Sequence, residues 1–119
     1  IVKVWLDSDG QSHEKVYNVA AADQRQIDFQ GNMPSVLSTV DVASASYDNS
    51  IGGVELFALW QDPDFNSQQR AAYYARVIEI PTPRWTTYDA KILNIDAPAP
   101  QALQERAISS AIWYSPSKK

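Results

Sequence analysis

Short stretches that alternate apolar and polar residues run through this chain, and they predict strands rather than helices. Residues 1–6 (IVKVWL) are β-branched or aromatic apart from Lys3 and Leu6, and residues 14–20 return with a similar pattern. Residues 7–10 (DSDG) between them have turn chemistry, because Gly10 can adopt a positive φ. The two segments therefore predict a β-hairpin at the start of the chain.

Three further segments are expected to be the longest strands: residues 54–60, 71–80 and 107–114. Residues 54–60 (VELFALW) carry apolar side chains on both alternating phases, which is typical of a strand buried on both sides or under a covering loop. Residues 39–47 predict another strand with one closely packed face. The expected core contains Leu56, Ala58, Val77 and Ile112.

The remaining segments are predicted to be connections. Residues 21–35 are polar and contain chain breakers, and prolines interrupt residues 81–100, so neither stretch can be a central strand. Only residues 66–72 and 101–106 are candidates for short helices. The pattern predicts a single all-β domain over residues 1–119, an antiparallel β-sandwich of the immunoglobulin-like type with one long Pro-rich connection.

The composition supports a folded domain and limits the kinds of partner that the chain is expected to bind. Of the 119 residues, 45% are hydrophobic and 20% charged, which is typical of a globular protein. Ten basic residues against 14 acidic ones give a net charge of −4, and no Lys/Arg cluster opposes it, which argues against a nucleic-acid partner. No apolar run approaches the ~18 residues that span a bilayer, so no membrane span is expected.

The start of the chain indicates a piece of a longer polypeptide. Ile1 begins in the middle of a predicted strand, without an initiator Met or a signal peptide. The sequence therefore leaves the compartment undefined, with the periplasm and secretion both open. It also leaves the oligomeric state undefined.

Residues suited to catalysis or metal binding are sparse. The chain has no Cys and a single His, His13, beside Ser12 and Glu14, which we interpret as a solvated residue at a strand end. Residues 7–10 resemble the start of a calcium loop, but the spacing of the following residues fails the pattern. Asp62-Pro63-Asp64 is interpreted as a turn. We therefore expect no catalytic residue, no metal site and no cofactor in this chain.

Residues 81–89 (PTPRWTTYD) are the strongest candidate for a contact site. Arg, Trp and Tyr are common interface anchors, and the prolines reduce the entropy lost on docking. The candidate residues are Arg84, Trp85, Tyr88 and Asp89. Three interpretations stay open: Trp85 and Tyr88 plug the end of the sandwich, the loop docks against another domain, or it binds a free ligand.

A family resemblance covers nearly the whole chain. Residues 78–85 (IEIPTPRW), followed by residues 88–90 (YDA), form its most specific block, and residues 104–107 and 110–116 extend it. On these residues the chain resembles the C-terminal region of the family called domain of unknown function 3604. The match reaches back to residues 2–7 (VKVWLD).

The resemblance implies a larger bacterial protein whose N-terminal part is similar to the polymerase-and-histidinol-phosphatase superfamily of metal-dependent hydrolases. The chain would then be a non-catalytic accessory β-sandwich that packs on, and helps shape, the N-terminal catalytic domain of the same polypeptide. It also implies that residues 73–77 and 107–114 are neighbouring strands and that residues 80–106 are an enlarged connection between them. The alternative is an autonomous carbohydrate- or protein-binding module that uses Trp85 and Tyr88.

Overall fold

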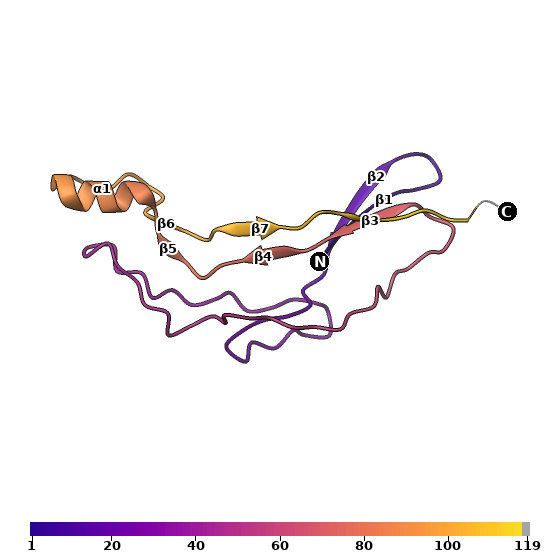
Figure 1. Ribbon diagram of the computed structural model, residues 1–119, viewed down its shortest axis with the longest axis horizontal. Coiled ribbons are helices and arrows are strands. Elements are labelled where there is room, and N and C mark those ends of the chain that lie inside the picture. Colours follow the sequence, from indigo (N-terminus) through magenta and orange to yellow (C-terminus); the bar gives the residue numbers. More distant parts are fainter. Residues whose placement is uncertain (118–119) are drawn as a thin grey trace.

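A computed structural model describes residues 1–117 and shows a mostly β chain with one short helix (Figure 1). Every strand pair in this part of the chain is antiparallel, as the sequence predicts. The elements follow in the order β1 (Val2–Leu6), β2 (Ser12–Val16), β3 (Ala71–Tyr74), β4 (Arg76–Ile78), β5 (Thr82–Pro83), α1 (Trp85–Leu93), β6 (Ala102–Leu103), β7 (Arg106–Ile108) and β8 (Ile112–Tyr114).

Four strands form the main sheet, in the order β2-β1-β3-β8. The predicted hairpin is confirmed: β1 pairs with β2 around the turn at residues 7–10, with Lys3 opposite Lys15. Strand β3 adds to β1, and β8 adds to β3, so segments that lie far apart in the sequence become neighbours. The neighbouring strands that the family resemblance implies are therefore present.

A narrow arm leaves this sheet and carries the helix at its far end (Figure 1). It consists of the ribbon β4/β7, then the pair β5/β6, then α1, so we call residues 76–108 the distal arm. The molecule measures 67 × 30 × 22 Å. Its radius of gyration is 19.1 Å, whereas a compact domain of this length has about 13.5 Å.

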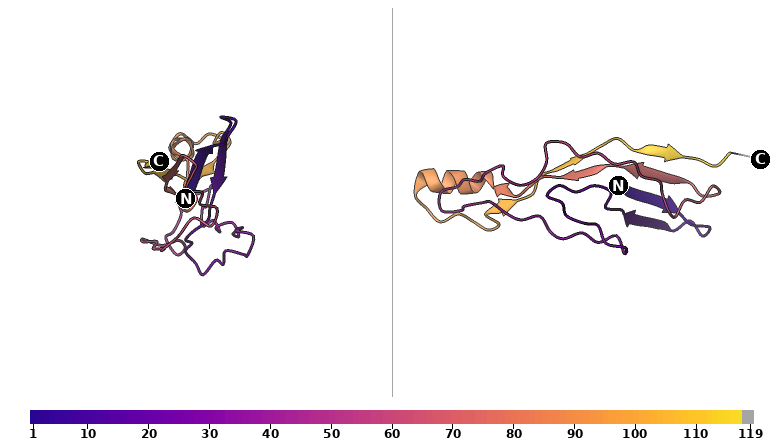
Figure 2. Two further views of the ribbon diagram at one scale, coloured as in Figure 1. Left: turned by 90° about the vertical axis from the view of Figure 1, so that its right-hand side faces the viewer. Right: turned by 90° about the horizontal axis from the view of Figure 1, so that it is seen from below.

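The segment between β2 and β3, residues 17–70, is irregular and contains only one isolated bridge, Asp41 to Ser46. It runs along the arm toward α1 and back (Figures 1 and 2). The predicted strand at residues 54–60 is therefore wrong, and the one at residues 39–47 is reduced to that bridge. Neither segment meets a partner strand with free backbone groups within residues 1–117, and a strand needs such a partner.

The predicted core is also wrong. Leu56 is 46% exposed, Val77 53% and Ile112 75%, and Ala58 is exposed as well. Small residues make up most of the buried apolar set instead, which is Val2, Ala45, Ala71, Ala72 and Ala90. The physical reason is the extended shape, because a narrow arm and a loose segment have little protein around their side chains.

Neither of the two candidate short helices is a helix in the structure. Residues 66–70 form turns that lead into β3, and residues 101–106 lead through β6 into β7. The helix lies instead where the sequence predicts a loop. Helix α1 begins two residues after Pro83 and ends at Leu93.

Candidate docking site on the distal arm

Helix α1 replaces the predicted loop at residues 81–89, and its ends explain why it forms. Arg84 precedes it with extended backbone angles (φ −66°, ψ 150°), and its carbonyl accepts a 2.8 Å hydrogen bond from the Thr87 N–H. Asn94 ends it in the left-handed region (φ 54°, ψ 48°), and Lys91 in the last turn suits the negative end of the helix dipole. The prolines before the helix do not destabilise it, because they lie outside its hydrogen-bonded turns.

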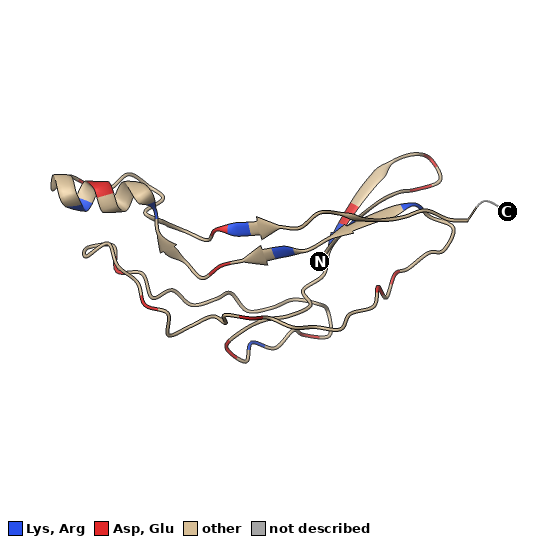
Figure 3. Ribbon diagram, viewed as in Figure 1, with Lys and Arg blue, Asp and Glu red and all other residues tan. Residues whose placement is uncertain are grey.

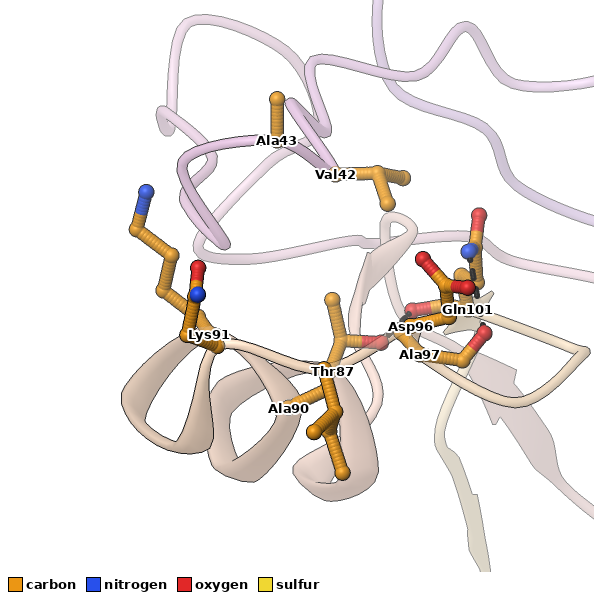
Figure 4. Close-up of a pocket in the computed structure, with 10 residues that line it drawn as sticks. Val42, Ala43, Thr87, Ala90, Lys91, Asp96, Ala97 and Gln101 are labelled. Carbon is orange, nitrogen blue, oxygen red and sulfur yellow. Dashed lines mark hydrogen bonds between the residues drawn. The ribbon is translucent and has the colours of Figure 1, made fainter.

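The inner face of α1 fixes the helix to the rest of the arm. Thr87 is 2% exposed, and its hydroxyl donates a 2.6 Å hydrogen bond to the Gln101 carbonyl, which also accepts one from the Arg84 N–H. Ala90, one turn further on, is buried too. Figure 4 shows this face looking across a hollow of roughly 280 Å³ toward Val42 and Ala43 of the irregular segment. The helix therefore has a defined orientation.

The outer face of α1 presents apolar side chains to solvent. Trp85, Tyr88 and Ile92 follow one another at helical spacing and are 67%, 40% and 80% exposed. Asp89 lies one turn from Trp85, and both line a second hollow together with Leu93 of the same helix and with Ile95 and Pro98 beyond it. Trp85 therefore does not plug the end of a sheet.

Three of the four predicted contact residues come together on this outer face: Trp85, Tyr88 and Asp89. Arg84 sits just ahead of them at the start of the helix. None of the three ion pairs within residues 1–117 involves Arg84. The arrangement offers an aromatic stripe flanked by one cation and one anion, which suits docking rather than bond cleavage.

Sequence reasoning missed a polar cluster on the main sheet. Lys3 is 3% exposed, and its ammonium group donates to the Asp62 carboxylate at 2.6 Å and to the Asp64 carbonyl at 2.8 Å. The Tyr73 hydroxyl donates to the same Asp62 oxygen at 2.7 Å. A lysine between Val2 and Val4 was the signal available in the sequence. The Asp62-Pro63-Asp64 turn is thus confirmed, and this cluster fastens it to the sheet.

The titration behaviour of the cluster argues against acid–base chemistry. Burial works to raise the pKa of Asp62, but hydrogen bonds from Lys3 and Tyr73 outweigh it and hold that pKa below its ordinary value. Burial and the hydrogen bond to Asp62 raise the pKa of Tyr73 to about 12. The carboxylate stays charged and the phenol stays neutral near pH 7, so neither can exchange a proton readily there.

The remaining candidate, His13, takes part in the hairpin turn. Its Nε2 lies 2.7 Å from an Asp7 carboxylate oxygen, and its ring stacks on Trp5 with centroids 5.4 Å apart. The other Asp7 oxygen accepts hydrogen bonds from the backbone of Asp9 and Gln11. Among residues 1–117, no group of three or more His, Cys, Asp or Glu could hold a metal ion. In the same part of the chain, no helix is long and apolar enough to cross a membrane.

Comparison with known proteins gives one match. A family model described as "Protein of unknown function (DUF3604)" matches residues 1–116. No curated protein and no solved structure matches the chain.

Proposed function

The chain belongs to the DUF3604 family, and on that premise we propose that it is a non-catalytic accessory β-domain. It packs on, and helps shape, a metal-dependent hydrolase domain of the same polypeptide. The observation that carries this proposal is the apolar surface left uncovered along the distal arm. Large apolar side chains left exposed in this number are typical of interaction sites in soluble proteins.

The ribbon β4/β7 supports the proposal most directly. Val77 and Ile78 are adjacent in β4, so their side chains point to opposite faces, yet they are 53% and 49% exposed. A two-stranded ribbon is marginally stable in water unless a further layer covers it. Both faces of this ribbon therefore have apolar area to bury against another structure.

The tip of the arm adds anchor-type side chains. Trp85 and Tyr88 supply large apolar area on a helix whose inner face is already fixed, so docking costs little conformational entropy. Arg84 adds a guanidinium suited to a bidentate contact with a carboxylate or another anion. We assign the outer face of α1 to the contact with the hydrolase domain.

The main sheet offers a second place for a partner. Val4 pairs with Ala72, which pairs with Trp113, so all three share one face, and Leu6 follows on that face by alternation. Leu6 is 51% exposed and Trp113 79%, whereas Ala72 and Val2 on the same face are already buried, so a partner would contact the exposed margins of this face. A second sheet packed here would complete the antiparallel, immunoglobulin-like sandwich that the sequence predicts.

The experiment combines two measurements on the same variants. In the full-length polypeptide, Arg84→Ala with Trp85→Ala should weaken packing between the domains, seen as faster proteolysis at their junction or lower hydrolase activity. In the 119-residue chain alone, Trp85→Ala should leave the unfolding midpoint nearly unchanged, because Trp85 is largely exposed. A loss of about 3–5 kcal/mol in the chain alone would instead show that Trp85 fills its own core, and would refute docking.

The competing function is an autonomous binding module with Trp85 and Tyr88 as a platform for a carbohydrate or a protein. Both side chains are accessible and Asp89 is adjacent, which is a suitable set for stacking and hydrogen bonding to a sugar. A glycan screen with the chain alone separates the two functions. Binding that Tyr88→Ala abolishes would favour the module.

A further inference from the structure

The ribbon β4/β7 separates its charges by face. Paired residues share a face, and the register pairs Arg76 with Ile108 and Ile78 with Arg106. We call the face formed by Arg76, Ile78, Arg106 and Ile108 the basic face. Figure 3 shows the two arginines in blue on the two strands, at staggered positions along the ribbon.

The opposite face has the opposite sign. Val77 pairs with Ala107, and one step further toward the helix Glu79 meets Glu105, whose carbonyl accepts a 3.0 Å hydrogen bond from the Glu79 N–H. By alternation these four residues share a face, which we call the acidic face. In Figure 3, red segments follow β4 and precede β7 on the side of the ribbon toward β5 and β6.

The basic face has two features of an unfilled contact. Ile78 and Ile108 are 49% and 65% exposed, so apolar area lies between the two guanidinium groups. Both arginines are exposed, and the three ion pairs within residues 1–117 involve neither of them. Two unpaired like charges on one short ribbon repel each other, and a partner with carboxylates would turn that repulsion into attraction.

We propose that the basic face binds a carboxylate-bearing apolar surface of the neighbouring domain, an inference that rests on the proposed accessory function. Arg76 and Arg106 each contact a carboxylate, and Ile78 and Ile108 fill the apolar space between these contacts. Nucleic acid does not fit, because Glu79 and Glu105 lie on the opposite face of the same narrow ribbon and the chain carries a net charge of −4.

The acidic face is the poorer docking surface. It offers one branched apolar side chain, Val77, against two on the basic face. Docking there would also remove water from two carboxylates that lie directly opposite each other, and this desolvation is costly without cations from the partner. The acidic face therefore serves as the matched control for the basic face.

The test reverses charge on one face at a time in the full-length polypeptide. One variant carries Arg76→Glu and Arg106→Glu, and the control carries Glu79→Arg and Glu105→Arg, so each changes two exposed charges on the same ribbon. Hydrogen exchange of the β4 and β7 amides reports whether the ribbon is covered. We expect exchange to accelerate at least about 30-fold in the basic-face variant and to change less than about threefold in the control.

Further variants separate the outcomes. Arg76→Gln with Arg106→Gln should give a smaller acceleration in the same direction, which excludes misfolding caused by the introduced acids. If Trp85→Ala releases the arm while the basic-face variant leaves exchange unchanged, the accessory function stands and this inference fails. If neither releases the arm, both proposals fail. If both faces matter equally and the exchange depends on protein concentration, the occupant is a second copy of the chain, and the inference is wrong.

Discussion

Lys3 and Lys15 occupy paired positions on β1 and β2, yet their surroundings differ. The ion pair of Lys3 with Asp62 is buried, with side chains 3% and 6% exposed, whereas the pair of Lys15 with Asp64 is half exposed. Breaking a buried pair leaves an uncompensated charge and costs about 3–5 kcal/mol. An exposed pair contributes about 0–1 kcal/mol.

We therefore expect Lys3→Met to lower the free energy of unfolding of the chain by about 3–5 kcal/mol. Lys15→Met should lower it by no more than about 1 kcal/mol, because water solvates the Asp64 carboxylate that remains. Urea denaturation of the two variants measures both values. Equal losses would mean that the polar cluster does not hold the turn onto the sheet.

Asp62 also predicts how stability depends on pH. Its folded-state pKa lies below the ordinary value of 3.8, so the unfolded chain takes up the proton first as the pH falls. The stabilisation is fully present above about pH 5 and is lost as the pH falls through 3.8 toward the folded-state pKa. Thermal unfolding midpoints should fall with acidification over this window, and Asp62→Asn should flatten that dependence. A variant with an unchanged acid slope would contradict the assignment.

At the scale of elements, two adjacent threonines in the first turn of α1 form a natural comparison. The Thr87 hydroxyl has a partner in the Gln101 carbonyl, whereas the buried Thr86 hydroxyl has none among the described residues. Valine has the same shape without the hydroxyl. Thr86→Val should therefore be neutral or stabilising by up to about 1 kcal/mol, because it removes an unsatisfied polar group.

Thr87→Val should lower the free energy of unfolding by about 0.5–1.5 kcal/mol, since one hydrogen bond is lost while the Gln101 carbonyl keeps the Arg84 N–H as a donor. Both variants carry the same change in helix propensity, so the difference between them isolates the hydrogen bond. Calorimetric unfolding of the two variants gives this difference. A larger loss for Thr86→Val would overturn the inner-face geometry of α1.

The N-terminal hairpin could be predicted because its signals are local. Residues 2–6 alternate, Gly10 allows the turn, and β2 follows at once. Pairing of β3 with β8 joins residues about 40 positions apart, and no local pattern specifies such a pair. Only the family resemblance predicts that these two strands are neighbours.

The sequence analysis predicts a loop in place of helix α1, because the prolines and two threonines there disfavour a helix more strongly than other residues favour one. Asn94 adopts a left-handed conformation that commonly ends helices, and Lys91 lies in the last turn. Trp85, Tyr88 and Ile92 also have helical spacing. These signals could have predicted the helix, and with it the shared outer face of Trp85, Tyr88 and Asp89. The unpaired state of Arg84 depends on tertiary contacts, which no local pattern contains.

Residues 54–60 show the opposite error. Their apolar residues on both phases predict burial on two sides, yet Val54, Phe57 and Leu59 are almost fully exposed and belong to no strand. The side-chain pattern is typical of a buried strand, but residues 1–117 do not bury this segment. An apolar pattern specifies that a segment is buried, but it does not specify what buries it.

At the scale of the whole molecule, the surface area that the chain exposes can be compared with that of a compact monomer of the same mass. The chain exposes 9170 Å², whereas a compact monomer of 13.3 kDa exposes about 6,450 Å². The excess is larger than the ~800 Å² that each partner buries in a standard protein interface. Apolar side chains on the distal arm and in residues 54–60 contribute to this exposed surface, and so do Leu6 and Trp113 on the main sheet. The proposed accessory role requires exposed apolar surface of this kind.

The same comparison predicts the denaturant response of the chain. The slope of the unfolding free energy against urea concentration, the m-value, scales with the surface newly exposed on unfolding. From these areas the chain should expose about four fifths of the surface that a compact 119-residue domain exposes. We expect an m-value of the chain alone reduced in that proportion, measured against a reference domain of equal length. A value equal to that of the compact reference would mean that the chain closes into a compact sandwich by itself in solution. In that case the arm would have no uncovered ribbon, and the accessory role proposed for it would lose its physical basis.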